Sequence, residues 1–318
     1  NPHCPLVVGA NRGICIWITL SCQAWSKPFS MAAHFFWALL DTFVIPHREL
    51  IVSCARDVAE EVLETLAPSA TLAAPRAADA SFYQDEYMSV ELTTLRRDDT
   101  TCYVADVWLA SPALLRTALA ENTFGRNVTD TVSELAGTNG AVLAVNGDFY
   151  GSRKSGWCLR NGVLYRDSMA SAATELLLVD ASGDFSIADD RAMTAGDAEG
   201  LWQIFSFGPA LVMDGQVSVN EDDEVARSMA SNPRTAIGQV GPLHYAFVVT
   251  DVRTEESAGL SLMQLADLMR EIGCETAYNL DGGGSSTMVF QGEVVNNPTT
   301  NGRTITEREV SDIVYIGL

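Results

Sequence analysis

The sequence predicts an α+β fold, in which a single domain is built on a mixed β-sheet with interspersed helices. Short apolar runs that are typical of strands outnumber the segments with helical periodicity. The helical segments do not alternate regularly with the strands, which argues against repeated βαβ units. The chain has 318 residues and a hydrophobic content of 47%, which is enough for one large core.

The first 80 residues differ in character from the rest of the chain. An apolar run over residues 31–45 is shorter than the ~20 residues that a membrane-spanning helix needs. Residues 49–66 carry apolar side chains at helical spacing, and the Ala/Pro-rich stretch over residues 67–78 is typical of a linker. We therefore predict an N-terminal membrane anchor or helical stem over residues 1–80, followed by a folded domain over residues 81–318.

Within the folded domain, capping residues predict where helices begin and apolar runs predict the strands. Ser111-Pro112 offers a cap and a first-turn proline for a helix. Thr131 with Glu134 resembles a capping box for a second helix. Ser261 begins the clearest helix, which Gly273 ends. Strands are expected over residues 101–109, 141–145, 176–179, 243–250, 275–280, 288–290 and 310–317, with a hairpin turn at Gln291-Gly292.

The chain is strongly acidic, with 41 Asp and Glu residues against 20 Lys and Arg residues and a net charge of −21. Such a surface repels nucleic-acid backbones, so no nucleic-acid partner is expected. Any phosphate site must therefore rely on local donors and an arginine. His244 is the only histidine in the predicted domain, which argues against a Ser-His-Asp triad and against a multi-histidine zinc site. A disulfide among Cys102, Cys158 and Cys274 stays open.

The most informative stretch is the glycine-rich segment NLDGGGSSTM over residues 279–288. It joins two apolar runs, which predicts a strand, a tight loop and a second strand. Successive glycines let a ligand approach the backbone closely, and consecutive amides from Gly282 to Ser285 can form an anion-binding concavity. The lysine of a Walker loop and the dinucleotide fingerprint are both absent from it. A carboxylate beside such donors suits chemistry on a phosphate or a sugar.

The segment NLDGGGSSTM resembles the signature of the phosphodiester glycosidase family. Further segments resemble that family in the expected order, and together they cover roughly residues 100–318. The family often has glycine where Asp148 stands, and often has Asp-Gly-Arg where this chain has Asp251-Val252-Arg253. The further segments are AVNGDFY at 144–150, FGPAL at 207–211, NPRTAIG at 232–238 and NNP at 296–298.

The resemblance implies hydrolysis of a sugar-1-phosphodiester to a free sugar and a phosphomonoester. It implies a phosphate-linked sugar substrate on a cell-surface or exopolysaccharide glycan, and an extracellular or cell-surface location with the N-terminal segment as membrane anchor. No cofactor is expected, although a hard divalent cation such as calcium or magnesium stays open. Two other functions also stay open: a non-catalytic glycan-binding module, and a metal-dependent phosphodiesterase that cleaves the P–O bond.

Polar residues at predicted strand ends are the candidate site residues. Glycosidases commonly use two carboxyl groups, so Asp281 is the first catalytic candidate, and Asp148 and Asp251 compete for the second place. Arg234 offers a planar fork that suits a phosphate. Each aspartate could instead cap a turn, and Arg234 could form a salt bridge. The other predicted substrate-binding residues are Asn146, Gly147, Thr235, Asn279, Gly282, Gly283, Gly284, Ser285, Ser286 and Thr287.

Overall fold

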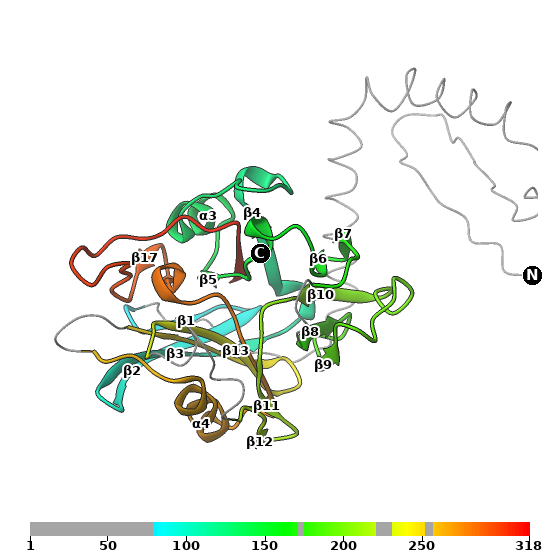
Figure 1. Cartoon of the computed structure of the whole chain (residues 1–318). Coiled ribbons are helices and arrows are strands. Elements are labelled where there is room, and N and C mark those ends of the chain that lie inside the picture. The colour runs from blue at the N-terminus through cyan, green and yellow to red at the C-terminus, as the bar shows by residue number, and fades with distance from the viewer. Residues whose placement is uncertain (1–78, 171–174, 221–230, 252–256) are drawn as a thin grey trace, which may run out of the picture. The chain divides into compact units, whose positions relative to one another are not determined.

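A computed structural model of the chain describes residues 79–170, 175–220, 231–251 and 257–318 (Figure 1). These residues belong to one compact unit, Pro68–Leu318. The predicted anchor, stem and linker lie outside the described residues, so the boundary at residue 80 stays a prediction. Within the described ranges, none of the helices has the length and apolar content that crossing a bilayer requires.

The described strands form three sheets, and every pairing within them is antiparallel. Strands dominate as predicted, but the prediction of one mixed sheet is wrong. Parallel neighbours need long crossover connections, whereas tight turns such as Gln291-Gly292 join antiparallel neighbours directly.

The largest sheet, called here the large sheet, has eight strands. Residues 100–109 and 244–250 form two of its central strands, as the apolar runs predicted. Its strand order is β1 (Phe82–Gln84), β2 (Met88–Arg97), β3 (Thr100–Leu109), β14 (His244–Thr250), β13 (Arg234–Gly241), β15 (Thr276–Asn279), β11 (Ala210–Met213) and β12 (Gln216–Val217).

Two five-stranded sheets complete the domain. The second sheet has the order β7 (Val163–Arg166), β6 (Cys158–Arg160), β10 (Leu201–Phe205), β8 (Glu175–Asp180) and β9 (Phe185–Asp189). The third sheet has the order β17 (Glu293–Val294), β16 (Met288–Phe290), β5 (Leu143–Asn146), β18 (Asp312–Ile316) and β4 (Leu115–Leu119).

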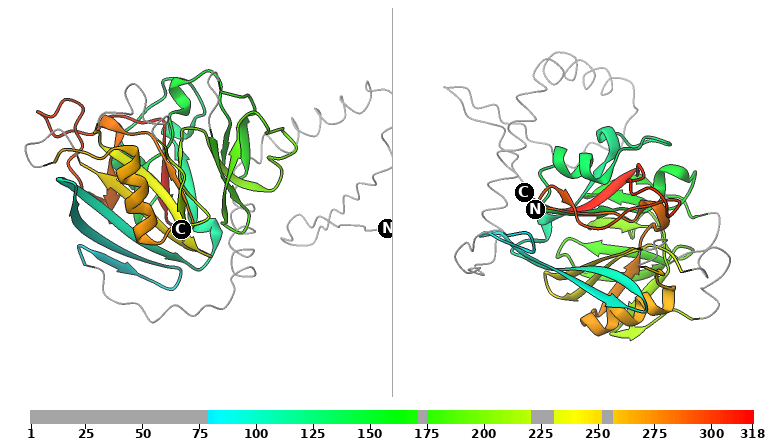
Figure 2. Two further views of the ribbon diagram at one scale, coloured as in Figure 1. Left: turned by 60° about the horizontal axis from the view of Figure 1, so that its bottom comes forward. Right: turned by 90° about the vertical axis from the view of Figure 1, so that its left-hand side faces the viewer.

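Two α-helices pack on these sheets, and both begin where their caps predicted. In α4 (Leu262–Ile272), Ser261 and Gln264 form a reciprocal capping box, and Gly273 ends the helix with φ 99°. In α3 (Val132–Thr138), the Thr131 hydroxyl accepts from the Glu134 N–H. Figure 2 shows α4 lying across one face of the large sheet, where it contacts β11, β12 and β13.

The helix predicted from Ser111 is wrong. Only a short 3₁₀ turn forms there, over Pro112–Leu114, and residues 115–119 continue as β4. This strand pairs with β18 along its full length. Leucine and alanine favour helix locally, but pairing at the sheet edge overrides that weak preference.

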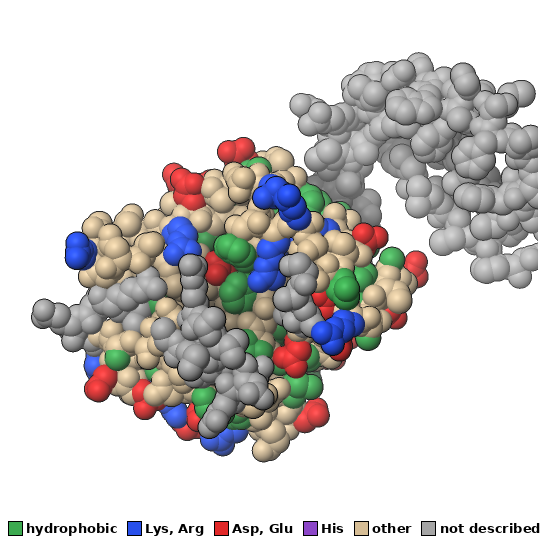
Figure 3. Space-filling model, viewed as in Figure 1, with side chains coloured by type: hydrophobic (Ala, Val, Ile, Leu, Met, Phe, Trp, Pro, Cys, Tyr) green, Lys and Arg blue, Asp and Glu red, His purple; other side chains and the backbone are tan. Residues whose placement is uncertain are grey.

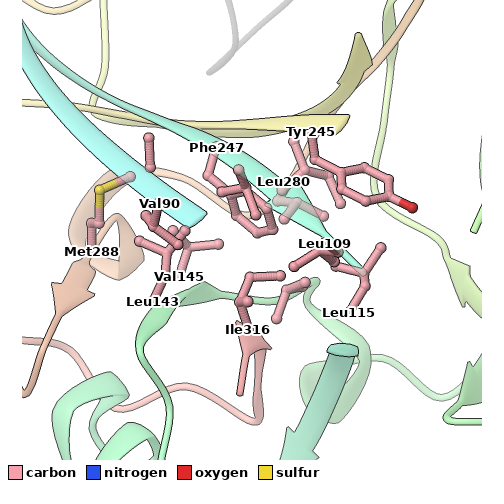
Figure 4. Packing of buried hydrophobic residues seen from close by; sticks show 14 of the residues in the cluster. Val90, Leu109, Leu115, Leu143, Val145, Tyr245, Phe247, Leu280, Met288 and Ile316 are labelled. Atoms are coloured by element: carbon pink, nitrogen blue, oxygen red, sulfur yellow. The ribbon is translucent and has the colours of Figure 1, made fainter. Parts of the chain in front are cut away.

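The main core draws buried side chains from all three sheets. Tyr245 and Phe247 of β14 belong to the same buried cluster as Leu143 of β5 and Ile316 of β18 (Figure 4). A second cluster lies beneath α4, on the opposite face of the large sheet. The large sheet is therefore covered on both faces, and the loops at the strand ends remain available to form a site.

Candidate active site

A cavity of ≈ 980 Å³ opens beside the glycine loop. Figure 3 shows a hollow in the middle of one face, where basic, acidic and hydrophobic side chains come together. The walls come from strands of the large and second sheets and from the loops that follow β5 and β15. The lining residues are Phe149, Arg153, Glu175, Ile187, Ala188, Asp189, Phe207, Gly208, Pro209, Met213, Asn232, Pro233, Arg234, Leu262, Asn279, Leu280, Asp281, Gly282, Gly283 and Arg308.

Some of the predicted site residues line this cavity, and the others do not. Those that line it are Arg234, Asn279, Asp281, Gly282 and Gly283. The remaining predicted residues are Asn146, Gly147, Asp148, Thr235, Asp251, Gly284, Ser285, Ser286 and Thr287, and they are absent from the lining.

Asp281 lies just beyond the end of β15 and is partly exposed. Its Oδ1 accepts from the N–H of Gly282 at 2.9 Å. Burial raises the pKa of the Asp281 carboxyl, although the Ser285 side chain, the Gly282 N–H and the Arg308 guanidinium act to lower it. A carboxyl group with a raised pKa keeps its proton to higher pH than an ordinary aspartate. This property suits an acid–base role in a cavity.

The glycine loop has the predicted strand–loop–strand form, between β15 and β16. Its amides, however, are mostly occupied within the protein. The N–H of Gly282 donates to Asp281, that of Gly283 to the Pro233 carbonyl at 2.9 Å, and that of Ser285 to the Gly282 carbonyl at 3.4 Å. The expected row of free donors from Gly282 to Ser285 is therefore not formed.

The glycines instead let other groups pack against the loop. A Cβ on Gly284 would lie 2.6 Å from Nη2 of Arg308 and would also overlap the Thr300 hydroxyl. A Cβ on Gly282 would lie 2.8 Å from the Pro233 carbonyl oxygen. These positions exclude larger side chains because neighbouring groups already occupy the space.

Asn146 connects the parts of the site from behind. Its Nδ2 donates to the Asp281 carbonyl at 2.7 Å, and its Oδ1 accepts from the Thr235 hydroxyl at 2.8 Å and from the Thr287 N–H at 3.4 Å. Asn146 and Thr235 are fully buried. These contacts position Asp281 by holding β5, β13 and the glycine loop together. The Ser286 and Thr287 hydroxyls are buried without a partner among the described residues.

Asn279 does reach the cavity. Its Nδ2 donates to the Gly208 carbonyl at 2.8 Å, while its Oδ1 has no hydrogen-bond partner among the described residues. A buried acceptor without a partner is costly, so a ligand hydroxyl at this point would be stabilising.

Three arginines line the cavity, of which the sequence predicted only Arg234. Arg234 is buried, and its Nε donates to the Leu260 carbonyl at 3.0 Å. Arg308 lies near Asp281, and its Nη1 donates to the Ser285 hydroxyl at 3.4 Å. In the part of the chain that the structure describes, Arg308 forms no ion pair with a carboxylate.

Arg153 is the third arginine. Its Nη1 donates to the Ser206 carbonyl at 2.7 Å, and its guanidinium carbon lies 5.8 Å and 5.5 Å from the ring centres of Phe149 and Phe207. It too lacks an ion pair to any described carboxylate. In so acidic a chain, arginines without carboxylate partners indicate an anion site. Arg153 lies three residues after the AVNGDFY segment, and this position is the sequence signal that could have identified it.

Asp148 belongs to a buried ionic cluster below the cavity. Its Oδ2 pairs with Arg160 Nη2 at 2.9 Å, and Asp312 Oδ2 accepts from Arg160 Nε at 2.8 Å. Burial raises the pKa of Asp312 to about 7. A Cβ on Gly147 would lie 2.5 Å from the Asp312 carboxyl carbon, so glycine is needed there. The neighbours of Asp148 give it a structural role, although no observation tests its predicted catalytic one.

Asp251 anchors a loop. Its oxygens accept from the Tyr103 hydroxyl at 3.1 Å, the Asn297 N–H at 2.9 Å and the Asn296 side chain at 3.2 Å. This accounts for the NNP segment, which wraps around the carboxylate. Arg253 lies outside the described residues. Among the described residues, no three Asp, Glu, His or Cys side chains gather in a manner that could hold a metal ion.

Fold and site together place a carboxyl group with a raised pKa beside arginine side chains, in a cavity built on antiparallel sheets. A family model described as "Phosphodiester glycosidase" matches residues 139–317, which is more than half of the chain. The chain therefore belongs to the phosphodiester glycosidase family, a class of hydrolases.

Curated relatives agree with this membership. The chain is 29% identical over 180 residues to the SPbeta prophage-derived uncharacterized protein YomE of Bacillus subtilis, covering 55% of this chain and 28% of that protein. It is 28% identical over 190 residues to the N-acetylglucosamine-1-phosphodiester alpha-N-acetylglucosaminidase of Bos taurus, covering 53% of this chain and 35% of that protein. The matches thus span about a third of the length of these relatives.

Solved structures share the fold. The catalytic domain of zebrafish N-acetylglucosamine-1-phosphodiester alpha-N-acetylglucosaminidase, auto-inhibited by its pro-peptide, is similar with a TM-score of 0.58 and 18% identity. That similarity covers 80% of this chain and 92% of the zebrafish chain. A hypothetical protein from Synechocystis is similar with a TM-score of 0.53 and 13% identity, over 76% of this chain and 64% of that chain.

Proposed function

We propose that this protein hydrolyses a sugar-1-phosphodiester by breaking the bond between the anomeric carbon and its oxygen. The products are a free sugar and a phosphomonoester. The observation that carries the proposal is the presence, in one cavity, of the Asp281 carboxyl with Arg308 and Arg153, which form no ion pair with a described carboxylate. Family membership and the named activity of the mammalian relatives support the same reaction.

Each side chain has a role in this reaction. Asp281 exchanges a proton with the leaving oxygen or with water, because burial raises its pKa and so favours the protonated form. Arg308 and Arg234 stabilise the charge on the departing phosphate. The unpartnered Oδ1 of Asn279 accepts from a sugar hydroxyl. Asn146 orients Asp281 through its backbone carbonyl.

The biological setting is part of the proposal. We propose that the substrate belongs to a cell-surface or exopolysaccharide glycan, that the protein acts outside the cell or at its surface, and that residues 1–80 supply a membrane anchor. The resemblance of the sequence to bacterial members of the family supports this setting. The mammalian relatives act on an N-acetylglucosamine phosphodiester by name, which makes N-acetylglucosamine the first sugar to test.

The first test is the replacement of Asp281 by asparagine. The amide keeps the shape but carries no exchangeable carboxyl proton, so hydrolysis of methyl N-acetylglucosamine-1-phosphate should fall by about 10²-fold or more. The rate of sugar release measures this. Asp267→Asn, on an exposed part of α4, serves as a control and should retain the wild-type rate.

Heavy-oxygen water identifies the bond that breaks. Label on the sugar supports cleavage between carbon and oxygen, whereas label on the phosphate would assign the protein to the phosphodiesterases. Binding of the substrate without turnover by the wild-type protein would instead identify a glycan-binding module.

A further inference from the structure

One part of the cavity has no role in the reaction above. Ile187 and Ala188 of β9, together with Met213 at the end of β11, give it an aliphatic wall, beside which Glu175 of β8 and Asp189 of β9 also line the cavity. Phe149 and Phe207 continue this wall on either side of Arg153. These residues come from β9 of the second sheet, from β11 next to the edge strand of the large sheet, and from the loops that carry Phe149 and Phe207.

Part of the apolar surface of this wall is exposed to solvent, unlike the buried core. Met213 and Phe149 are each 38% exposed, so their apolar surface faces solvent. Single exposed apolar side chains are common, but here two of them border the same cavity together with the half-buried Ile187 and Phe207. Burial of such a surface by a ligand would be favourable.

The chemistry of the wall does not match a second sugar. A sugar ring needs hydrogen-bond donors and acceptors around its hydroxyls, and aliphatic side chains offer none. Ile187, Ala188 and Met213 instead match a hydrocarbon.

The size of the cavity allows a further group beside the sugar phosphate. Its ≈ 980 Å³ lies at the upper end of the range of about 300–1,000 Å³ that is usual for small-molecule sites. Asp281, Asn279 and Arg308 define a polar end, and the aliphatic wall defines a second end. Arg153 lies among the apolar residues of that wall, where it can hold an anionic group attached to a hydrocarbon.

We propose that the substrate is a sugar-1-phosphodiester whose second alcohol is apolar, such as an alkyl or isoprenoid chain. The inference rests on the proposed function and deepens it. In the reaction, water adds its oxygen to the anomeric carbon while the bond from that carbon to the phosphate oxygen breaks. The oxygen keeps the bonding electrons, so an alkyl phosphate leaves, and a proton from water is released. The alkyl chain lies against Ile187 and Met213, and Arg153 contacts the phosphate from that side.

The experiment compares two esters of N-acetylglucosamine-1-phosphate, one with methanol and one with n-octanol, at concentrations where the octyl ester is monomeric. The full chain should hydrolyse the octyl ester with a kcat/KM about tenfold or more above that of the methyl ester, the effect of burying roughly two methylene groups. Met213→Gln should lower this octyl-to-methyl ratio about threefold or more. Val163→Gln, which changes an exposed apolar residue outside the cavity, should leave the ratio unchanged.

A readout independent of turnover is the binding of octyl phosphate and methyl phosphate, measured by calorimetry. Octyl phosphate should bind more tightly, and Ile187→Ala and Met213→Gln should each reduce the difference. Equal kcat/KM values for the two esters, with no effect of Met213→Gln, would overturn the apolar alcohol while leaving the proposed hydrolysis intact. Absence of hydrolysis for both esters, with octyl phosphate still bound preferentially, would count against the proposed function instead.

Discussion

At the scale of single residues, the environment separates aspartates that look alike in the sequence. Asp281, Asp148 and Asp251 all follow apolar strands. Only Asp281 faces the cavity, while Asp148 pairs with Arg160 and Asp251 accepts from the NNP loop. A carboxylate whose oxygens are already occupied supports the fold, and one with a cavity before it is available for chemistry.

Asp312 gives a pH-dependent prediction. The folded protein keeps the Asp312 proton up to a pKa of about 7, whereas the unfolded chain releases it near 3.8. Its contribution to stability is therefore full below pH 3.8 and is lost as the pH rises towards 7. Asp312→Asn removes this dependence. As the pH rises through this window, the free energy of unfolding of the variant should therefore increase relative to that of the wild type, by up to about 1.4 kcal/mol per pH unit.

Denaturant unfolding between pH 4 and pH 8 measures the effect. The isosteric amide can still accept from Arg160, which limits the structural change. Parallel stability curves for the two proteins would show that Asp312 does not hold a proton in the folded state.

The limits of sequence-based prediction are visible in the same residues. Asp281, Arg234 and Asn279 were identified because each belongs to a motif at a strand end. Arg153 and Arg308 were missed because their position depends on contacts with Ser206 and Ser285, which are distant in the chain. The one local signal was the place of Arg153 three residues after the AVNGDFY segment, and Arg308 has no such signal.

At the scale of elements, the strongest local signals were the most reliable. The caps at Ser261 and Thr131 marked α4 and α3 correctly, and apolar runs located β3, β5 and β14. Strand β7 was missed because none of its residues is buried, so it shows no alternation between a core face and a solvent face. The sequence did not predict which strands pair in the three sheets, because these pairings join segments that are distant in the chain.

The glycine loop gives a prediction at this scale. A methyl group at Gly284 would collide with Arg308, so Gly284→Ala should displace the guanidinium and lower kcat/KM by about tenfold or more. Gly137→Ala, within α3, is the matched control. A Cβ there meets nothing within 4 Å, so the variant should be active and more stable by about 0.5–1 kcal/mol. Equal activity of the two variants would show that Arg308 has no role.

At the scale of the whole molecule, a cavity that gathers three arginines lies within a strongly acidic protein. The net charge of −21 repels an anionic substrate at long range, and dissolved salt screens this repulsion. The arginines attract the substrate at short range inside the cavity, where screening is weaker. Raising the ionic strength from about 10 mM to about 150 mM should therefore increase kcat/KM for a phosphodiester. A decrease over this range would mean that the local field of the arginines controls the encounter.

The position of β18 in the third sheet has a consequence for how the protein folds during synthesis. This strand is formed by residues 312–316, yet it lies inside the third sheet, between β5 and β4. It also brings Asp312 to Arg160, 152 residues earlier in the chain. During synthesis, therefore, the third sheet stays open until these residues have left the ribosome. Because contacts between such distant segments form slowly, catalytic competence should arrive only after β18 has paired with β4 and β5.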